Sequence, residues 1–412
     1  MLYIMKIWVK LLVGSVLGTI LGFLLPYESE SVSGILAWFE QFALHLGRYS
    51  VMPLLFFALI IAVYELRMDK EFWPLAGKSF LVMICGAIGI IFLGIVVTLL
   101  FLPARIPIQE EQVETITLEL PETILQIFPD NMFNALFTDG TFIFPLCVLA
   151  FFIAMGLSSD RNYSRPVIGL ADSLSRIVYH ISVFFTEILA LGIIALSAYW
   201  AVRFHAVLAT NVFWDLILLL GIFSLVLSFG IFPLLLYLLK SKNPWAQLYG
   251  SLGPAIGGFF SGDVNFTLPL LIRHVKENLG VRRRANAVTI SLFAVFGRAG
   301  SAMVAAASFI VIIKSYSILG ISPVNALSIG VRAVLISFLL ARHPGTGAYT
   351  ALAVLGMSYD RGFEAGYLIL KPLAFYLIAI GAFIDTMFCS FASYAVGKMS
   401  GFQEDKDIRH FI

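Results

Sequence analysis

The stretch AQLYGSLGPAIGGFFSGDVNFTLPLLI, residues 246–272, is apolar enough for a membrane, yet Gly and Pro interrupt it at seven positions. A second stretch, PVNALSIGVRAVLISFLLARHPGTGAYTALAVLGMS at residues 323–358, is broken in the same way at RHPGTG, residues 342–347. Each stretch predicts a helix, a turn and a second helix. Irregular backbone at membrane depth is tolerated only where protein or a water-filled cavity covers it. Paired broken segments of this kind are typical of the binding site of a transporter.

The composition of the whole chain places both stretches in a membrane protein. Of its 412 residues, 60% are apolar and 13% are charged, whereas a soluble domain carries roughly 25% charged residues. The mean hydropathy of +0.94 indicates an all-α polytopic membrane protein. A net charge of +2 excludes a strongly basic nucleic-acid-binding protein. Three cysteines, Cys85, Cys147 and Cys389, have neither metal-ligand nor disulfide spacing, and we expect no cofactor.

Full membrane spans need about 20 mostly apolar residues each. Eight runs meet this requirement, and the first of them is too long for a signal peptide, so we expect it to be retained. The predicted spans are residues 7–26, 47–66, 79–102, 140–157, 177–201, 212–239, 285–313 and 362–397.

The loops between the spans differ in basic residues. Lys and Arg recur in loops 67–78, 158–176 and 273–284, whereas residues 27–46 contain none and residues 103–139 contain only Arg105 against seven acids. The positive-inside rule therefore predicts that both termini are cytoplasmic. We expect the protein in the inner membrane of the cell. The broken stretches then become two re-entrant hairpins, one entering from each face.

Four ionisable residues lie deep in the predicted membrane segments: Glu187, Asp263, Arg298 and Asp385. A charge there costs a few kcal/mol, so its default interpretation is functional. Two interpretations of the last three stay open, namely a structural ion network and a network that also binds substrate or carries a proton. Glu187 is more often a satisfied residue at a domain contact. His343, at the turn of the second hairpin, is either a proton-carrying group or a solvated gate residue.

Three strings show a resemblance to a known family. FPDNMFNALFTDGTFIFPLCVLAFFIAMGL (128–157) is similar to a P-x-N-x-F-x-A-L loop that runs into a fourth span. FSGDVNFTLPLLIRHVKENLGV (260–281) is similar to a serine-rich hairpin tip with T-L-P and E-x-N-L-G-V, and HPGTGAYTALAVL (343–355) to a V-P-G-A-G tip. These features resemble the dicarboxylate/amino acid:cation symporters, the glutamate transporter homologues.

This resemblance implies a homotrimeric secondary transporter that works by an elevator mechanism. The scaffold and trimerisation domain would comprise mainly residues 1–78 and 128–205. The transport domain would comprise mainly residues 79–102 and 206–412, with residues 103–127 as an extracellular loop. The substrate would lie between the two hairpin tips and the unwound part of the seventh span, and the second hairpin would form the outer gate.

The resemblance also implies where the substrate binds. The candidate substrate-binding residues are Asp263, Val264, Asn265, Arg298, Ser301, Pro344, Gly345, Thr346, Gly347 and Asp385. On the family template, Arg298 stands between Asp263 and Asp385. These two carboxyl groups and His343 are the candidates for proton coupling.

The chain departs from the family at the sodium sites. The family's N-M-D-G-T becomes GRAGS at residues 297–301, and Cys389 stands at the last sodium-binding Asp. Gly381 replaces the Arg that grips an acidic side chain, and Ile378 replaces the Asp that receives the substrate amine. Hard cations prefer oxygen ligands. We therefore expect no metal site, and sodium-independent transport of a small carboxylate with protons as the candidate coupling ion.

Other classes of function compete with an acidic amino acid or dicarboxylate transporter. A transporter or exchanger of neutral amino acids or other small solutes stays open because of Gly381. An anion channel is disfavoured because nothing resembles a carbonyl-lined filter or a ring of charge. A membrane enzyme would need Asp263 and Asp385 to share a proton, which an arginine between them opposes, so we expect no enzyme. The chain has no G-x-x-x-x-G-K-[ST] loop for ATP-driven transport.

The expected partners are the lipid bilayer and a small solute, not nucleic acid.

Overall fold

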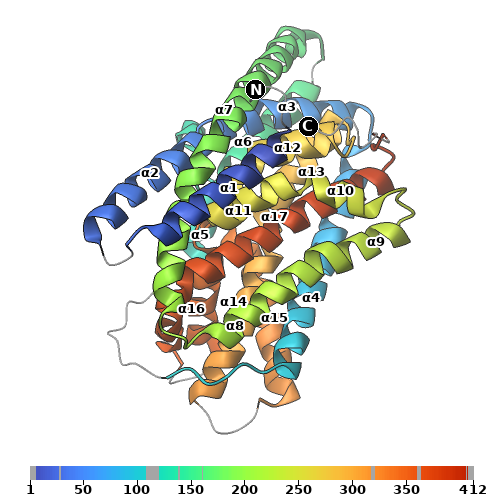
Figure 1. The fold of residues 1–412 in the computed structure, drawn as a ribbon. Helices are drawn as coiled ribbons and strands as arrows, with labels where there is room; N and C mark the ends of the chain where they lie inside the picture. Colours follow the sequence, from blue (N-terminus) through green and yellow to red (C-terminus); the bar gives the residue numbers. More distant parts are fainter. Residues whose placement is uncertain are drawn as a thin grey trace.

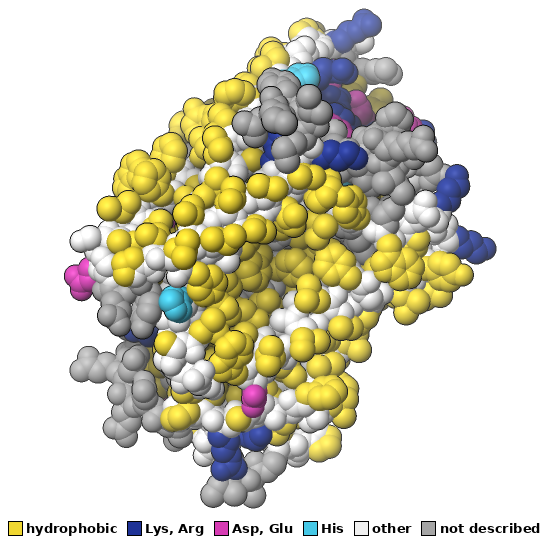
Figure 2. All heavy atoms as spheres, in the orientation of Figure 1, with side chains coloured by type: hydrophobic (Ala, Val, Ile, Leu, Met, Phe, Trp, Pro, Cys, Tyr) yellow, Lys and Arg dark blue, Asp and Glu magenta, His cyan; other side chains and the backbone are white. Residues whose placement is uncertain are grey.

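The computed structural model describes residues 6–26, 29–107, 120–137, 140–159, 161–316, 321–359, 363–404 and 406. Within these ranges the regular structure is helical, and one isolated β-bridge pairs Val281 with Gln403. Eight helices there are long and apolar enough to cross a membrane, which confirms the predicted all-α polytopic class. Figure 2 shows hydrophobic side chains over the middle of the molecule, and most of the visible Lys and Arg at its upper right end.

The first half of the chain contains seven α-helices and one short 3-10 helix in the described residues. They are α1 (Ile7–Leu24), α2 (Glu30–Arg48), α3 (Val51–Met68), α4 (Phe72–Leu100), α5 (Leu120–Ile127), η2 (Met132–Leu136), α6 (Phe144–Ser159) and α7 (Arg161–Leu208). Helix α1 lies along α7, and the contact uses Gly14, Gly18 and Gly22, where a Cβ atom would meet α7 directly. Small residues at a spacing of four let two membrane helices approach closely.

Helix α2 corrects one prediction, because residues 27–46 were expected to form a loop. The helix buries its small residues Ala43 and Gly47, whereas the large apolar side chains of Trp38 and Phe42 are exposed. The helix packs on α7, and its N-cap is Ser29, whose side chain accepts a hydrogen bond from the backbone of Val32. A search for runs of about 20 apolar residues does not find such a helix.

Helix α7 extends well beyond the predicted span 177–201, and so the prediction that 158–176 is a loop is wrong over most of its length. With 48 residues, the helix is about 72 Å long at 1.5 Å per residue. The hydrocarbon core is about 30 Å thick. One end of α7 therefore projects past the other helices, as Figure 1 shows at the top of the molecule.

The second half of the chain is built from interrupted helices. They are α8 (Trp214–Val226), the π-helix η3 (Leu227–Ile231), α9 (Phe232–Leu238), α10 (Pro244–Gly250), α11 (Leu252–Ser261), α12 (Val264–Glu277), α13 (Arg283–Phe296), α14 (Ala299–Tyr316), α15 (Pro323–Leu339), the 3-10 helix η4 (Leu340–Arg342), α16 (Gly347–Tyr359), the 3-10 helix η5 (Gly366–Leu373) and α17 (Ala374–Met399). Helices α14 and α17 pack against each other at the centre, and nearly all of α14 is buried.

Three interruptions fall where the sequence predicts them. The chain turns between α11 and α12 at Gly262, between α13 and α14 at Gly297, and between η4 and α16 at residues 343–346. By length, α15 together with η4 (Pro323–Arg342) belongs with the helices that could span a membrane, and α6, with 16 residues, falls among the shorter ones. The re-entrant nature of both hairpins therefore stays a prediction.

Candidate functional site

Five segments meet inside the protein: the turn of α11 and α12, the turn before α16, the break between α13 and α14, helix α17, and the end of α2. The short distances from glycines of one segment to atoms of another show that these segments converge. A Cβ atom on Gly262, whose φ is +64°, would lie 2.7 Å from Cγ2 of Ile378 on α17. A Cβ atom on Gly347 would lie 3.2 Å from Oγ of Ser301, and one on Gly345 would lie 3.5 Å from Nη2 of Arg48. Both predicted hairpin tips and the broken helix thus share one site.

Asp263 caps α12 and forms an ion pair that the sequence did not predict. Its Oδ1 accepts a hydrogen bond from the backbone of Asn265 at 2.8 Å, as an N-cap aspartate does. Its Oδ2 lies 2.7 Å from both Nε and Nη2 of Arg48, at the end of α2. The Asp263 side chain is fully buried and that of Arg48 is 20% exposed. The charge of Asp263 is therefore compensated from the first half of the chain.

Arg298 occupies the break between α13 and α14 and is 2% exposed. Its Nη2 donates to Oδ1 of Asn265 at 3.2 Å. The amide nitrogen of Asn265 donates in turn to the carbonyl of Thr141 at 2.8 Å, in the loop before α6. The buried Nε of Arg298 has no hydrogen-bond partner in the described residues.

Asp385 holds the N-terminus of α14. Its Oδ1 accepts hydrogen bonds from the backbone of Gly300 at 2.6 Å and of Ser301 at 3.2 Å, and its Oδ2 accepts from Oγ of Ser301 at 2.6 Å. A carboxylate is stabilised there by the free N–H groups and the helix dipole.

The pairing therefore differs from the predicted one, in which Arg298 stands between two carboxylates. Asp263 and Asp385 remain the nearby charges that stabilise Arg298. However, no ion pair within 4.0 Å joins Arg298 to a carboxylate in the part of the chain that the structure describes. The physical reason is that each carboxylate has closer donors, Arg48 for Asp263 and the start of α14 for Asp385.

This arrangement leaves one buried guanidinium without a carboxylate of its own. A buried charge that lacks a close partner costs several kcal/mol. Arginine binds a carboxylate through two parallel N–H groups. Nε of Arg298 is unbonded, and Nη2 bonds only a neutral amide. Nε of Arg298 is thus a buried donor without an acceptor among the described residues.

The other candidate residues line the same region. Val264 is buried beside Asp263, and Pro344 is buried in the second turn. Thr346 is exposed there, and its Oγ1 lies 3.1 Å from Oγ1 of Thr350. His343 is half-buried at the same turn, and its role in proton coupling stays a prediction.

Glycine at position 381 is required by packing. A Cβ atom there would lie 2.9 Å from Oγ of Ser301, 3.0 Å from its Cα and 3.1 Å from Cβ of Ala348. Because α14, α16 and α17 meet at this point, the packing leaves no space for the arginine that the resemblance places at this position.

We expect the substitution Gly381→Ala to lower the free energy of unfolding by about 1–3 kcal/mol, the usual cost of overpacking. Oγ of Ser301 cannot move away without losing its hydrogen bond to Asp385. Gly89→Ala on α4 is the matched control, because a Cβ atom there meets nothing within 4 Å. Thermal melting in detergent measures both variants, and equal melting temperatures would contradict the expectation.

Glu187 lies outside this site, at a contact between α7, α1 and α12. Its carboxylate lies 2.6 Å from Nζ of Lys10 and 3.1 Å from Nη1 of Arg273. The interpretation of Glu187 as a satisfied residue at a contact is confirmed. In the described ranges no group of three or more His, Cys, Asp or Glu side chains is placed to hold a metal ion.

Sequence comparisons point in the same direction as this geometry. The model of the sodium:dicarboxylate symporter family matches residues 7–390. Excitatory amino acid transporter 2 of Homo sapiens is 25% identical over 247 residues, which cover 59% of this chain and 42% of that protein. The proton/sodium-glutamate symport protein of Bacillus subtilis is 24% identical over 236 residues, 54% of each chain. The chain spans about half the length of the curated relatives it matches.

Proposed function

The chain belongs to the sodium:dicarboxylate symporter family, whose members are transporters and not enzymes, and from this premise we propose that it is a secondary transporter that binds a small carboxylate on Arg298. The observation that carries the proposal is the buried guanidinium of Arg298, whose Nε lacks a partner among the described residues. It lies where both hairpin tips approach the broken helix.

The proposed substrate is an acidic amino acid or a dicarboxylate. The family description names dicarboxylates, and the Bacillus subtilis relative is named a glutamate symport protein. A neutral amino acid is the second candidate. It is favoured by Gly381 and Ile378, which offer no charge on α17 for a second carboxylate or for an amine.

The proposed mechanism is an elevator movement of one part of the protein against the other, in a homotrimer in the inner membrane with cytoplasmic termini. The scaffold would contain α1 to α3 and α6 to α7, and the transport part would contain α4 and α8 to α17. The exposed turn at Thr346 would open as the outer gate. The ion pair of Arg48 with Asp263 would cross between the two parts.

We propose that transport does not depend on sodium and that a proton carried by Asp263, Asp385 or His343 is the candidate coupling ion. Support comes from Arg298, a fixed cation at the break where the family resemblance implies a sodium site. A second cation nearby would be repelled by this charge.

Uptake into proteoliposomes tests this proposal. We expect uptake of radiolabelled aspartate, glutamate or succinate to continue when choline replaces sodium, and to rise when an inward proton gradient is imposed. Empty liposomes under the same gradients are the control. An obligatory requirement for sodium would overturn the proposed independence from this ion, and an absence of uptake for every acid would move the proposal to neutral amino acids.

A further inference from the structure

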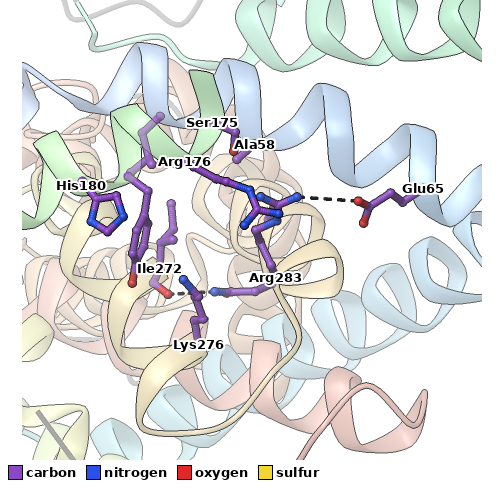
Figure 3. A pocket seen from close by; sticks show the side chains of 12 residues that line it. Ala58, Glu65, Ser175, Arg176, His180, Ile272, Lys276 and Arg283 are labelled. Atoms are coloured by element: carbon purple, nitrogen blue, oxygen red, sulfur yellow. Dashed lines mark hydrogen bonds and ion pairs between the residues drawn. The ribbon is translucent and has the colours of Figure 1, made fainter. Parts of the chain in front are cut away.

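A cavity of about 480 Å³ lies apart from the Arg298 site, among α3, α7, α12 and α13. Figure 3 shows its lining, where Arg176 of α7, Lys276 of α12 and Arg283 of α13 lie close together. Leu54 and Ala58 of α3 line an apolar part of the wall. The cavity thus combines positive charge with hydrocarbon surface.

Three cations and one carboxylate are among the described residues that line the cavity. Arg283 lies 2.5 Å from Asp172 and 3.7 Å from Glu65. Of these two carboxylates, Glu65 belongs to the lining of the cavity and Asp172 does not. Arg176 shares Asp172, at 3.0 Å, and its side chain is 69% exposed. One aspartate therefore serves two guanidinium groups.

Lys276 lacks an anionic hydrogen-bond partner. Its ammonium lies 3.8 Å above the ring of Tyr179, and no hydrogen-bond acceptor for it occurs in the described part of the chain. Burial lowers the pKa of Lys276, Glu277 raises it, and the like charges of Arg283 and Arg176 lower it again. An anion in the cavity would stabilise the charged ammonium.

We propose that this cavity binds a phosphate group, presented by an anionic phospholipid, with Lys276 and Arg176 as its ligands. Phosphate is a strong acceptor for both cations. The volume falls in the range of small-molecule sites, about 300–1,000 Å³, and is larger than a phosphate ion alone needs. The apolar wall of Leu54 and Ala58 suits the glycerol and first methylene groups of a lipid. The basic end of the molecule is also where anionic lipids are attracted.

The bound headgroup would have a consequence for movement. Arg176 stands on α7 and Lys276 on α12, so one phosphate would tie together the two parts that slide in the elevator mechanism. This consequence rests on the proposed function, whereas the binding itself does not.

Thermal melting and native mass spectrometry of the purified protein test the binding. We expect phosphatidylglycerol to raise the melting temperature with concentration, because a ligand of the folded state stabilises it by mass action. Phosphatidylcholine is expected to have no such effect. Lys276→Gln is expected to weaken the affinity roughly tenfold or more, whereas Lys276→Arg keeps the charge and the binding.

Lys78→Gln is the matched control, because Lys78 is a basic residue outside the cavity that bonds the carbonyl of Met399. Stabilisation by inorganic phosphate alone, lost in Lys276→Gln, would support the site and identify free phosphate as the ligand. Equal stabilisation of the unchanged protein and Lys276→Gln, or by phosphatidylcholine, would overturn the proposal. Melting and mass spectrometry do not require transport. A failure of the uptake experiment would therefore not contradict the proposed lipid site.

Discussion

Arg298→Gln is expected to weaken binding of the carboxylate substrate roughly 30-fold or more, a loss of about 2 kcal/mol or more, as when one partner of a buried charge pair is removed. Arg298 is 2% exposed, so water has little access to its position. Arg298→Lys should also bind weakly, because a lysine ammonium cannot offer the paired N–H groups. Calorimetric titration or substrate-dependent melting of the purified variants measures the effect.

Stability without substrate separates this role from a structural one. A glutamine at position 298 removes a buried charge that has no carboxylate within ion-pair distance in the described residues, so the unliganded variant should lose much less stability than Arg48→Gln does. Arg332→Gln is the control, since Arg332 lies over the ring of Tyr359 on the second hairpin. Substrate affinity that survives Arg298→Gln would contradict the assignment, as would a large loss of stability in the absence of substrate.

Much of the fold follows from the sequence because membrane helices must satisfy their own backbone. Runs of apolar residues predicted most helices, and the Gly and Pro interruptions predicted the turns at Gly262 and at residues 343–346. Helix α2, which was not predicted, carries Glu40 and Arg48 among its apolar residues. These charged residues lower its mean hydropathy, so a search for apolar runs does not find it. Its stability comes from packing on α7, which local sequence does not report.

Three of the charged residues that the sequence singled out lie near one another, but their pairings were not predicted. Asp263, Arg298 and Asp385 come together, as the resemblance implies, and their charges act on one another. Arg48 was overlooked because a basic residue at the start of an apolar run is ordinarily a helix end near water. It meets Asp263 across 215 positions of sequence, and nothing in local spacing reports such a contact.

The ion pair of Arg48 with Asp263 gives the second large expected effect. Arg48→Gln should lower the free energy of unfolding by about 3–5 kcal/mol, because it leaves the fully buried carboxylate of Asp263 without its cation. Asp263→Asn should cost less, since Arg48 is 20% exposed and reaches some water. The double variant, with no charge in the pair, should recover a substantial part of the loss from Arg48→Gln. Melting of the unchanged protein, the two single variants and the double variant in detergent gives the coupling energy between Arg48 and Asp263 directly.

Arg282→Gln supplies the control for a surface pair. Arg282 lies 3.1 Å from Glu404, both side chains are more than half exposed, and the change should alter stability by less than about 1 kcal/mol. Additive losses in the double variant would show that Arg48 and Asp263 do not stabilise each other.

Uptake adds a second criterion. If α2 and α12 separate during an elevator movement, the pair must break in every cycle. Where Asp385 or His343 carries the proton, the uncharged double variant should then transport at least as fast as the unchanged protein, because a contact that opposes the movement has been removed. Slower uptake by a double variant of normal stability would instead mean that Asp263 acts in substrate binding or proton coupling, and would contradict a role of the pair as an interface contact alone.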